Sequence, residues 1–302
     1  MKQEELLNIV TDNAVFDGAY NIRVNGKLFD RKTNENVDIV SKEGASGIDI
    51  FIKDGTVGQT IGIPVVLTSG DIQEVVLNDF HIGKNCDVTI IAGCGIDNCS
   101  SCTSQHDGVH TFYVGQNSKV KYIERHYGHG EGSGQKVMNP ETVINMEKDS
   151  KMEMITTQLE GVDSTVRKTT AHLADGANLV ITEKVLTTGE QKATSIFDVD
   201  LDGKNSKAKL SSRVVAKDNS YQDFYSDVKG NNDCYAHIEC DAIIVNNAKV
   251  GSTPKIVANH PDASLVHEAT IGKIAGEQLL KLLSLGLDEK EAEDAIIQGF
   301  LK

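Results

Sequence analysis

A short repeat runs through the second half of the chain and constrains its fold more than any other feature. A polar turn, a small residue and a stretch of alternating apolar and polar positions recur about every 14 residues, and such a short and persistent period indicates a solenoid. The small residues are Ser150, Ser164, Ala177, Ala193, Ser206, Ser220, Cys234, Ala248 and Ala263, with similar marks at Cys86 and Ser118.

The segments between these marks predict strands. Examples are "KVKYIERH" (119–126), "KMEMITTQLEG" (151–161) and "LVITEKVLTTG" (179–189), in which alternation of period two is bounded by turn residues. About 14 residues cannot hold a βαβ crossover or a helix pair, but they can hold two short strands and two turns. We therefore predict that each unit is one coil of a flattened β-helix. An antiparallel meander or sandwich is the alternative, and the regular spacing favours the solenoid.

The pattern changes to helical spacing after Ile271. Apolar positions in "IGKIAGEQLLKLLSLGL" and "DEKEAEDAIIQGFLK" predict two helices, with Gly286 at the turn and a capping box from Asp288 to Glu291. We expect a short N-terminal helical segment over 1–20, a β-helix core over 21–270 and the helical pair over 271–302. The pair is predicted to cap one end of the solenoid. Its apolar face then packs on its own domain or docks a partner.

Composition and charge exclude several classes of protein. The net charge of −14 disfavours binding to nucleic acid, whose phosphates the chain would repel. No stretch approaches the roughly 20 apolar residues that span a bilayer. The first residues, "MKQEELLNIVTDN", carry acids where a secretory signal has an apolar core. We therefore expect a cytoplasmic, globular protein with no membrane partner.

Three of the six cysteines lie close together in the sequence. Cys94, Cys99 and Cys102 have the spacing of the plant-type ferredoxin run, whose fourth ligand lies downstream. His106 and His110 follow at four-residue steps, so a zinc site built from cysteine and histidine is also open. The remaining interpretation is a loop whose thiols have no role.

A second candidate site lies near the end of the predicted β-helix. Cys240 and Glu268 are separated in the sequence by the length of two predicted coils. With about 4.8 Å per layer, they would lie some 10 Å apart on one side of the solenoid. That separation suits a cluster edge or a site completed by a second subunit, rather than one shared metal ion. Taken alone, Cys240 would be a core cysteine, and His267 and Glu268 an ordinary polar pair.

Hydrolytic chemistry has little support in the sequence. The chain has no G-x-S-x-G elbow, no H-E-x-x-H helix and no phosphate-binding Walker loop. Many β-helix proteins cleave polysaccharides, but the absence of tryptophan and an aromatic content of 5% disfavour a sugar-stacking groove.

The C-terminal part of the chain resembles the SufB/SufD family of iron–sulfur cluster assembly proteins. The resemblance extends over about 139–302. Its motifs are a Cys-Asp pair at Cys240, a His-Glu-Ala run at His267, an Ile-Gly-Lys, a Gly-Leu turn and a closing Gly-Phe. It implies a right-handed parallel β-helix followed by C-terminal helices, in agreement with the repeat.

Within the family, the motifs are those of SufB. SufB-like members carry cysteine at the position of Cys240 and His-Glu at the position of His267 and Glu268, whereas SufD-like members usually lack the glutamate. The resemblance implies that Cys240 and Glu268 are the metal ligands of a nascent iron–sulfur cluster, of the [4Fe-4S] type, and that His267 assists. Cys102 lies near the position of a SufB cysteine that is thought to accept sulfur, and Cys94 and Cys99 join it as candidates for cluster binding.

The resemblance also implies partners. The expected protein is a scaffold and not an enzyme, and SufC, an ABC-type ATPase, binds its C-terminal helices. Because the chain is much shorter than usual SufB members, it resembles the minimal form that works with SufC alone. A homodimer then replaces the SufB–SufD heterodimer in a B2C2 assembly, which exchanges sulfur with a donor and clusters with apo-protein acceptors. The alternatives are a SufD-like structural subunit without a cluster and, less favoured, a zinc-binding β-helix enzyme.

Overall fold

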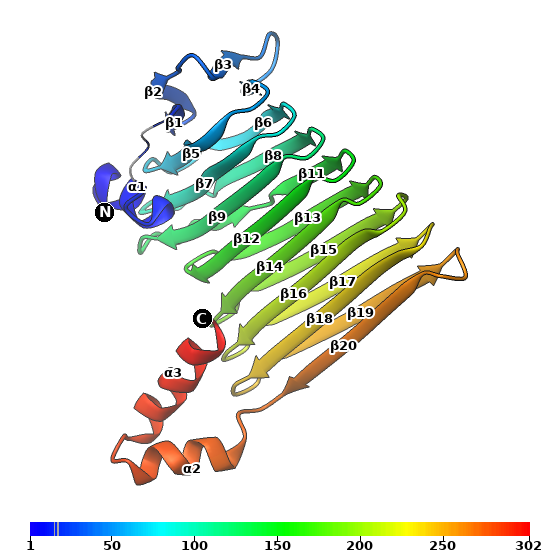
Figure 1. Ribbon diagram of the computed structural model, residues 1–302. Coiled ribbons are helices and arrows are strands. Elements are labelled where there is room, and N and C mark those ends of the chain that lie inside the picture. The colour runs from blue at the N-terminus through cyan, green and yellow to red at the C-terminus, as the bar shows by residue number, and fades with distance from the viewer. Residues whose placement is uncertain (15, 17) are drawn as a thin grey trace.

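From residue 57 onward, the strands of the chain alternate between two sheets of parallel strands that face each other, which makes the fold a β-solenoid (Figure 1). The structure is a computed structural model that describes residues 1–14, 16 and 18–302. The first ten-stranded sheet, sheet A, has the order β2 (Lys27–Lys32), β1 (Tyr20–Val24), β5 (Val57–Leu67), β7 (Asp87–Asp97), β9 (Lys119–His129), β12 (Lys151–Glu160), β14 (Asn178–Thr187), β16 (Ser206–Ala216), β18 (Cys234–Ile244) and β20 (Ser264–Gly272).

Sheet B faces sheet A and also has ten strands. From the N-terminal end these are β3 (Val37–Ser41), β4 (Gly47–Ile52), β6 (Gln73–Ile82), β8 (Ser104–Val114), β10 (Lys136–Met138), β11 (Glu141–Met146), β13 (Ser164–Leu173), β15 (Lys192–Leu201), β17 (Tyr221–Gly230) and β19 (Lys249–Ala258). The short strands β10 and β11 lie end to end between β8 and β13. The predicted mainly-β solenoid with a short N-terminal helix and a C-terminal helical pair is confirmed.

The predicted size of one coil was wrong by a factor of two. Each repeat unit holds one long strand and one turn, and a full coil takes two units. Ser206 pairs in register with Cys234, and Tyr235 with Ser264, so each strand of sheet A lies beside the strand two units further along the chain. At about 3.3 Å per residue, a ten-residue strand spans roughly 33 Å, so the sheets are wide and one unit cannot hold two strands.

The recurring small residues mark the two edges of the solenoid in alternation. They lie at the starts of strands, in sheet A for Ser150, Ala177, Ser206, Cys234 and Ala263, and in sheet B for Ser164, Ala193, Ser220 and Ala248. Most are buried, because the two sheets meet at these edges. One or two residues earlier the backbone is often left-handed, as at Asp149, Asn205 and Asn246, with φ of 59°, 59° and 60°. Asn and Asp tolerate this conformation better than other side chains with a Cβ, which explains the polar turns.

Inward-facing side chains of both sheets form one apolar core along the solenoid. Toward the N-terminal end it contains the stacked rings of Phe80 and Phe112, whose centroids are 4.4 Å apart. Helix α1 (Gln3–Thr11) covers the outer face of sheet A at this end, where fully buried Leu6 and Val10 pack against Val66. Gly95 of β7 makes room for the helix, since a Cβ there would lie 2.6 Å from the Leu6 side chain.

The two C-terminal helices, α2 (Gly276–Ser284) and α3 (Glu289–Phe300), do not cap the end of the solenoid as predicted. They turn back along its side, and the outer edges of β19 and β20 stay uncovered in the described part of the chain (Figure 1). The reason is an apolar strip at the ends of sheet A, where Val215 and Val245 pack against Ile297 and Leu301 of the C-terminal segment. The predicted capping box is confirmed by reciprocal hydrogen bonds between Asp288 and Glu291.

The left-handed turns predict which substitutions the solenoid tolerates. Asn205 is exposed and has a φ of 59°, so its side chain contributes little packing. We expect Asn205→Val to lower the free energy of unfolding by about 1–2 kcal/mol, because a β-branched residue is strained at positive φ. Asn205→Gly should change it by a few tenths of a kcal/mol. Urea unfolding followed by circular dichroism measures both, and Lys204→Val, at the exposed neighbour, should be close to neutral. Equal effects of the three substitutions would contradict this account of the repeat.

Candidate functional site

Cys240 lies inside the solenoid near its uncovered C-terminal end. Along β18, every second side chain faces inward, and Ile238, Cys240 and Ala242 share that face. The Cys240 side chain is fully buried. Burial raises the pKa of its thiol to about 11, with a smaller opposing effect from the Ser252 hydroxyl on β19. The thiol is therefore protonated near neutral pH in this state of the chain.

His267 and Glu268 follow each other on β20, so they face opposite sides of sheet A. His267 pairs in register with buried Ile238, which directs its ring inward, to the same side as Cys240. Its Nε2 atom is buried and has no hydrogen-bond partner among the described residues. Glu268 pairs with outward-facing Glu239, and its carboxylate lies 3.4 Å from Nε2 of His237.

The predicted separation between Cys240 and Glu268 needs correction. The sequence between them amounts to one coil and not two, so they lie on neighbouring strands of sheet A. Cys240 is paired with Ala269, next to Glu268 in the chain. However, the Glu268 side chain is 66% exposed on the outer face while Cys240 is buried on the inner face. The two predicted ligands are thus close along the backbone, but their side chains point apart.

The outer face beside Glu268 carries further carboxylates. Glu239 accepts a hydrogen bond from Ser211 at 3.2 Å, and Asp241 lies two residues further along the same strand. Burial and the neighbouring Glu239 carboxylate raise the pKa of Asp241. This face therefore presents hard oxygen ligands, whereas the inner face presents a thiol and an imidazole.

The structure does not bring the three neighbouring cysteines together. Cys94 lies on β7 with its side chain inside the solenoid, where burial raises the pKa of the thiol well above its usual range. Cys99 and Cys102 are exposed in the turn between β7 and β8. The Cys102 carbonyl accepts a hydrogen bond of 2.7 Å from the buried Asn98 amide, which fixes this turn. The ferredoxin-like spacing is therefore not matched by a shared ligand geometry.

Sequence reasoning missed a cluster of charged residues in the interior. Arg167 of β13 is ion-paired with Glu124 of β9, and its Nε lies 3.7 Å from Glu183 of β14. All three side chains are at most 4% exposed. Burial opposes ionisation of Glu124, but the charge of Arg167 outweighs it and holds the pKa of this carboxyl well below its usual range. Ser195 and Ser212 each donate a 2.7 Å hydrogen bond to Glu183.

This cluster is continuous with the C-terminal site. One inward column of sheet A, paired in register from strand to strand, consists of Glu124, Thr156, Glu183, Ser212 and Cys240. A signal for it was present in the segment "KVKYIERH". The alternation that directs Val120 and Tyr122 inward also directs Glu124 and His126 inward.

Comparison with known proteins assigns the chain to a family. The model of the SUF system FeS cluster assembly SufBD core domain matches residues 72–300, which include most of the solenoid and both C-terminal helices. The chain belongs to the SufBD family. It therefore has a role in the assembly of iron–sulfur clusters by the SUF system, in a family whose members are generally non-catalytic assembly components.

Archaeal relatives of this SufBD protein match it over most of its length. It is 29% identical to an iron–sulfur cluster assembly SufBD family protein of Pyrococcus horikoshii over 285 residues, covering 91% of this chain and 84% of the relative. It is 25% identical to one of Methanocaldococcus jannaschii over 280 residues, covering 91% and 87%. A third, of Methanothermobacter thermautotrophicus, is 28% identical over 235 residues, covering 72% and 53%.

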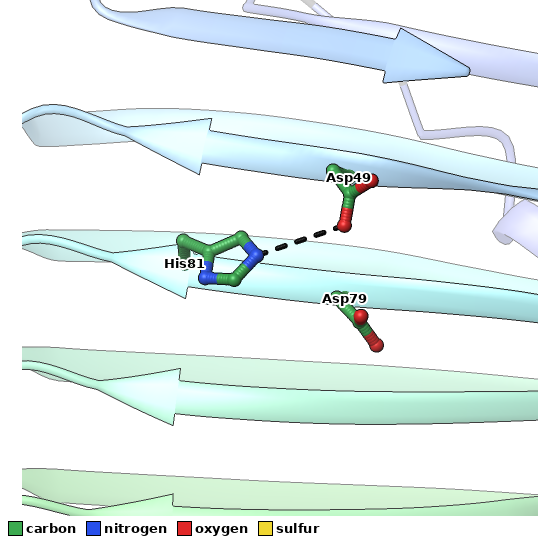
Figure 2. A group of neighbouring side chains, drawn as sticks. All are labelled: Asp49, Asp79 and His81. Carbon is green, nitrogen blue, oxygen red and sulfur yellow. Dashed lines mark ion pairs between the residues drawn. The ribbon is translucent and has the colours of Figure 1, made fainter. Parts of the chain in front are cut away.

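A group of potential metal ligands on the outer face of sheet B has another role in this SufBD protein. Figure 2 shows Asp49 of β4 beside Asp79 and His81 of β6, with ligand atoms within 4.8 Å of one another. The Nζ atom of Lys42 lies 2.6 Å from a carboxylate oxygen of Asp49 and 2.7 Å from one of Asp79. These hydrogen bonds outweigh burial and raise the pKa of Lys42. An ammonium group thus already neutralises the two carboxylates, and the group is an ion-pair node of the N-terminal coils.

A groove of the SufBD protein also lies on sheet B. It has a volume of about 610 Å³ and contains a row of rings in which His81 stacks between Phe51 and Tyr113, with centroids 4.7 and 5.1 Å away. None of the residues predicted to bind a cluster or metal lines it.

Among the described residues, the helices are all too short or too polar to cross a membrane.

The positions of the six thiols predict an order of chemical modification. We expect iodoacetamide to modify Cys99 and Cys102 first in the native protein at pH 8, because both are exposed. Cys240 should react far more slowly, since with a pKa of about 11 only about one thiol in a thousand is ionised at that pH. Mass spectrometry of peptides after timed labelling measures the order. Labelling of Cys240 as fast as Cys99 would show that the terminal coil opens readily, and denaturant should make all the rates similar.

Proposed function

We propose that this SufBD protein is a SufB-like scaffold on which an iron–sulfur cluster, of the [4Fe-4S] type, is assembled and then transferred. The observation that carries the proposal is the arrangement at the uncovered end, where Cys240 and His267 face the same side of the last two strands of sheet A. A thiolate and an imidazole both suit iron. This end is also where the interior of the solenoid is least covered, so iron and sulfide can reach it.

Glu268 is the exchangeable ligand in this proposal. A carboxylate is a harder and weaker ligand for iron in a cluster than a thiolate, which favours release to an acceptor. Because Glu268 faces outward and Cys240 faces inward, the two residues of one chain bind the same cluster only if β20 shifts. Otherwise the cluster is shared between two chains, each of which supplies some of the ligands. β20 is the last strand of sheet A and is hydrogen-bonded to another strand on one side only. It can therefore move without breaking backbone hydrogen bonds to a second strand.

A second copy of the chain is the proposed partner at this end. The outer edges of β19 and β20 carry unpaired backbone groups, and such edges pair readily with other strands. A homodimer formed here would bring two copies of Cys240, His267 and Glu268 together. With two ATPase subunits it would form the B2C2 assembly, with a separate sulfur donor and apo-protein acceptors.

The proposed ATPase partner, a SufC-like ABC protein, binds the C-terminal helices. Helix α2 has no buried residue, and Leu280 and Leu285 are 66% and 76% exposed. Only residues 273–275 separate the end of β20 from the start of α2. A movement of α2 driven by ATP hydrolysis would therefore be passed directly to the strand that carries His267 and Glu268.

Reconstitution tests the scaffold proposal. Anaerobic incubation with iron and sulfide should give a brown protein with the absorbance and Mössbauer signature of a [4Fe-4S] cluster. Cys240→Ser should abolish this, and Glu268→Ala and His267→Ala should lower cluster content severalfold, because each removes a ligand. Cys234→Ser is the matched control, since Cys234 is also buried on β18 and belongs to the core.

Three outcomes would reject this assignment. Colour that survives Cys240→Ser and Glu268→Ala, but is lost when Cys94, Cys99 and Cys102 are replaced, would move the cluster to the other thiols. Failure of the wild-type protein to hold any cluster would favour the SufD-like structural subunit. Stoichiometric zinc together with activity in the absence of SufC would favour the zinc-binding enzyme.

The ATPase interface gives an independent prediction. Replacing both Leu280 and Leu285 by Asp should weaken binding of the SufC-like partner by about tenfold or more, because it puts charge into an apolar contact. The thermal unfolding midpoint should stay unchanged, since both side chains are exposed. Isothermal titration calorimetry measures the affinity, and Gln298→Asp on the exposed side of α3 is the control. Equal affinities of the double variant and the wild type would exclude this surface as the interface.

A further inference from the structure

The outer face of sheet A carries a patch of positive charge in an acidic chain. The chain has a net charge of −14, but lysine and arginine recur at the outward positions of β9, β12, β14 and β16. The lysines and the arginine of β9 are ion-paired with carboxylates. Lys184, Lys209 and Arg213 have no aspartate or glutamate partner in the part of the chain that the structure describes.

The register of the strands places these three cations around a recess. Lys184 of β14 pairs with Arg213 of β16, so their Cα atoms are about 4.8 Å apart at sheet spacing. Lys209 precedes Arg213 by four residues on the same face of β16, which is roughly 13 Å along the strand. The register pair of Thr182 and Ser211 lies between them. Two short hydroxyl side chains thus form the floor, and longer cationic side chains stand at both ends.

The recess is shallowly enclosed on its other two sides as well. It has a volume of about 250 Å³, and all five of these side chains line it. Ile155 of β12 borders it on one side and Glu239 of β18 on the other. The Glu239 carboxylate accepts a hydrogen bond of 3.2 Å from Ser211. Three cationic side chains therefore face one carboxylate, and the recess keeps an excess of positive charge.

Repulsion between the cations shows how close together they lie. Burial lowers the pKa of Lys184, and the charges of Arg213 and Arg125 lower it further. The Lys184 ammonium donates a hydrogen bond of 2.5 Å to the main-chain oxygen of Lys302, which brings it no carboxylate side chain. An anion held between Lys184 and Arg213 would remove this repulsion.

We propose that this recess binds a phosphate group, either free in solution or carried by a small molecule. The Arg213 guanidinium presents paired N–H donors that match two phosphate oxygens, and Lys184 and Lys209 add point charges. The Thr182 hydroxyl supplies a further donor from the floor. Since one water molecule takes about 30 Å³ of the liquid, the recess is larger than a single phosphate group needs. It has room for a second phosphate group or for the rest of a small molecule.

The proposed site is separate from the proposed cluster site. Cys240 faces the interior of the solenoid, whereas Lys184, Lys209 and Arg213 face outward. Cys240→Ser should therefore bind phosphate as the wild type does, so the outcome does not depend on whether the chain holds a cluster.

Isothermal titration calorimetry of the full chain with pyrophosphate and with inorganic phosphate tests the proposal. We expect one equivalent of pyrophosphate to bind, with an affinity that falls as the salt concentration rises. Pyrophosphate should bind more tightly than inorganic phosphate, because it carries more charge and fills more of the recess. Equal affinities would still support the site and would identify a single phosphate group as its occupant.

Four variants locate the bound anion. Arg213→Gln and Lys209→Gln should each lower the affinity about tenfold, because they remove charge and donors at opposite ends of the recess. Glu239→Gln should raise it severalfold by removing the carboxylate that repels the phosphate, and a damaged fold would not produce a change in this direction. Lys151→Gln is the matched control, since it removes one exposed positive charge from the outer face of β12 outside the recess. Circular dichroism and the unfolding midpoint verify that each variant is folded.

Two outcomes would overturn the proposal. Absence of stoichiometric binding of both pyrophosphate and inorganic phosphate to the folded wild type would leave the patch to an acidic protein partner. Equal weakening by Lys151→Gln and Arg213→Gln would show that the overall charge of the face attracts the anion, rather than the recess.

Discussion

The in-register stacking of parallel strands is the constraint on which the rest of this structure depends. Each residue lies beside its equivalent one coil later, so side chains form columns along both faces of each sheet. A column that faces inward has no access to water, and any polar member must find its partner within the column or across from it. The positions of glycine, serine and charge in this sequence follow from that rule.

The inward column from Glu124 to Cys240 illustrates the consequence. Burying Arg167 with two carboxylates is costly, and apolar residues of similar volume would often be as stable. The three charges are accommodated because Ser195 and Ser212 satisfy Glu183, and Tyr122 satisfies Glu124. The interior is thus polar along this column, from Glu124 to the thiol of Cys240, beside the apolar core.

Much of the fold could be predicted from the sequence, because alternation and turn residues are local signals. The solenoid, the C-terminal helices and the capping box of Asp288 were predictable for this reason. The length of a coil was not, since the short period of the repeat fits one wide strand or two narrow ones equally well. This error also misplaced Glu268 relative to Cys240. The Arg167 cluster was missed because its members are far apart in sequence and meet only once the register of the coils is known.

The two ends of the solenoid differ, and the difference bears on where chemistry can occur. At the N-terminal end, short antiparallel strands and helix α1 cover the first coils. At the C-terminal end, α3 packs on the side of sheet A instead, because Val215 and Val245 offer it an apolar strip there. The edges of β19 and β20 therefore remain available for another chain. Cys240 lies one strand in from this edge, between β16 and β20, with Ser252 of β19 beside its thiol. In the proposed scaffold, a movement of β20 would therefore change the access to this thiol without disturbing the rest of the solenoid.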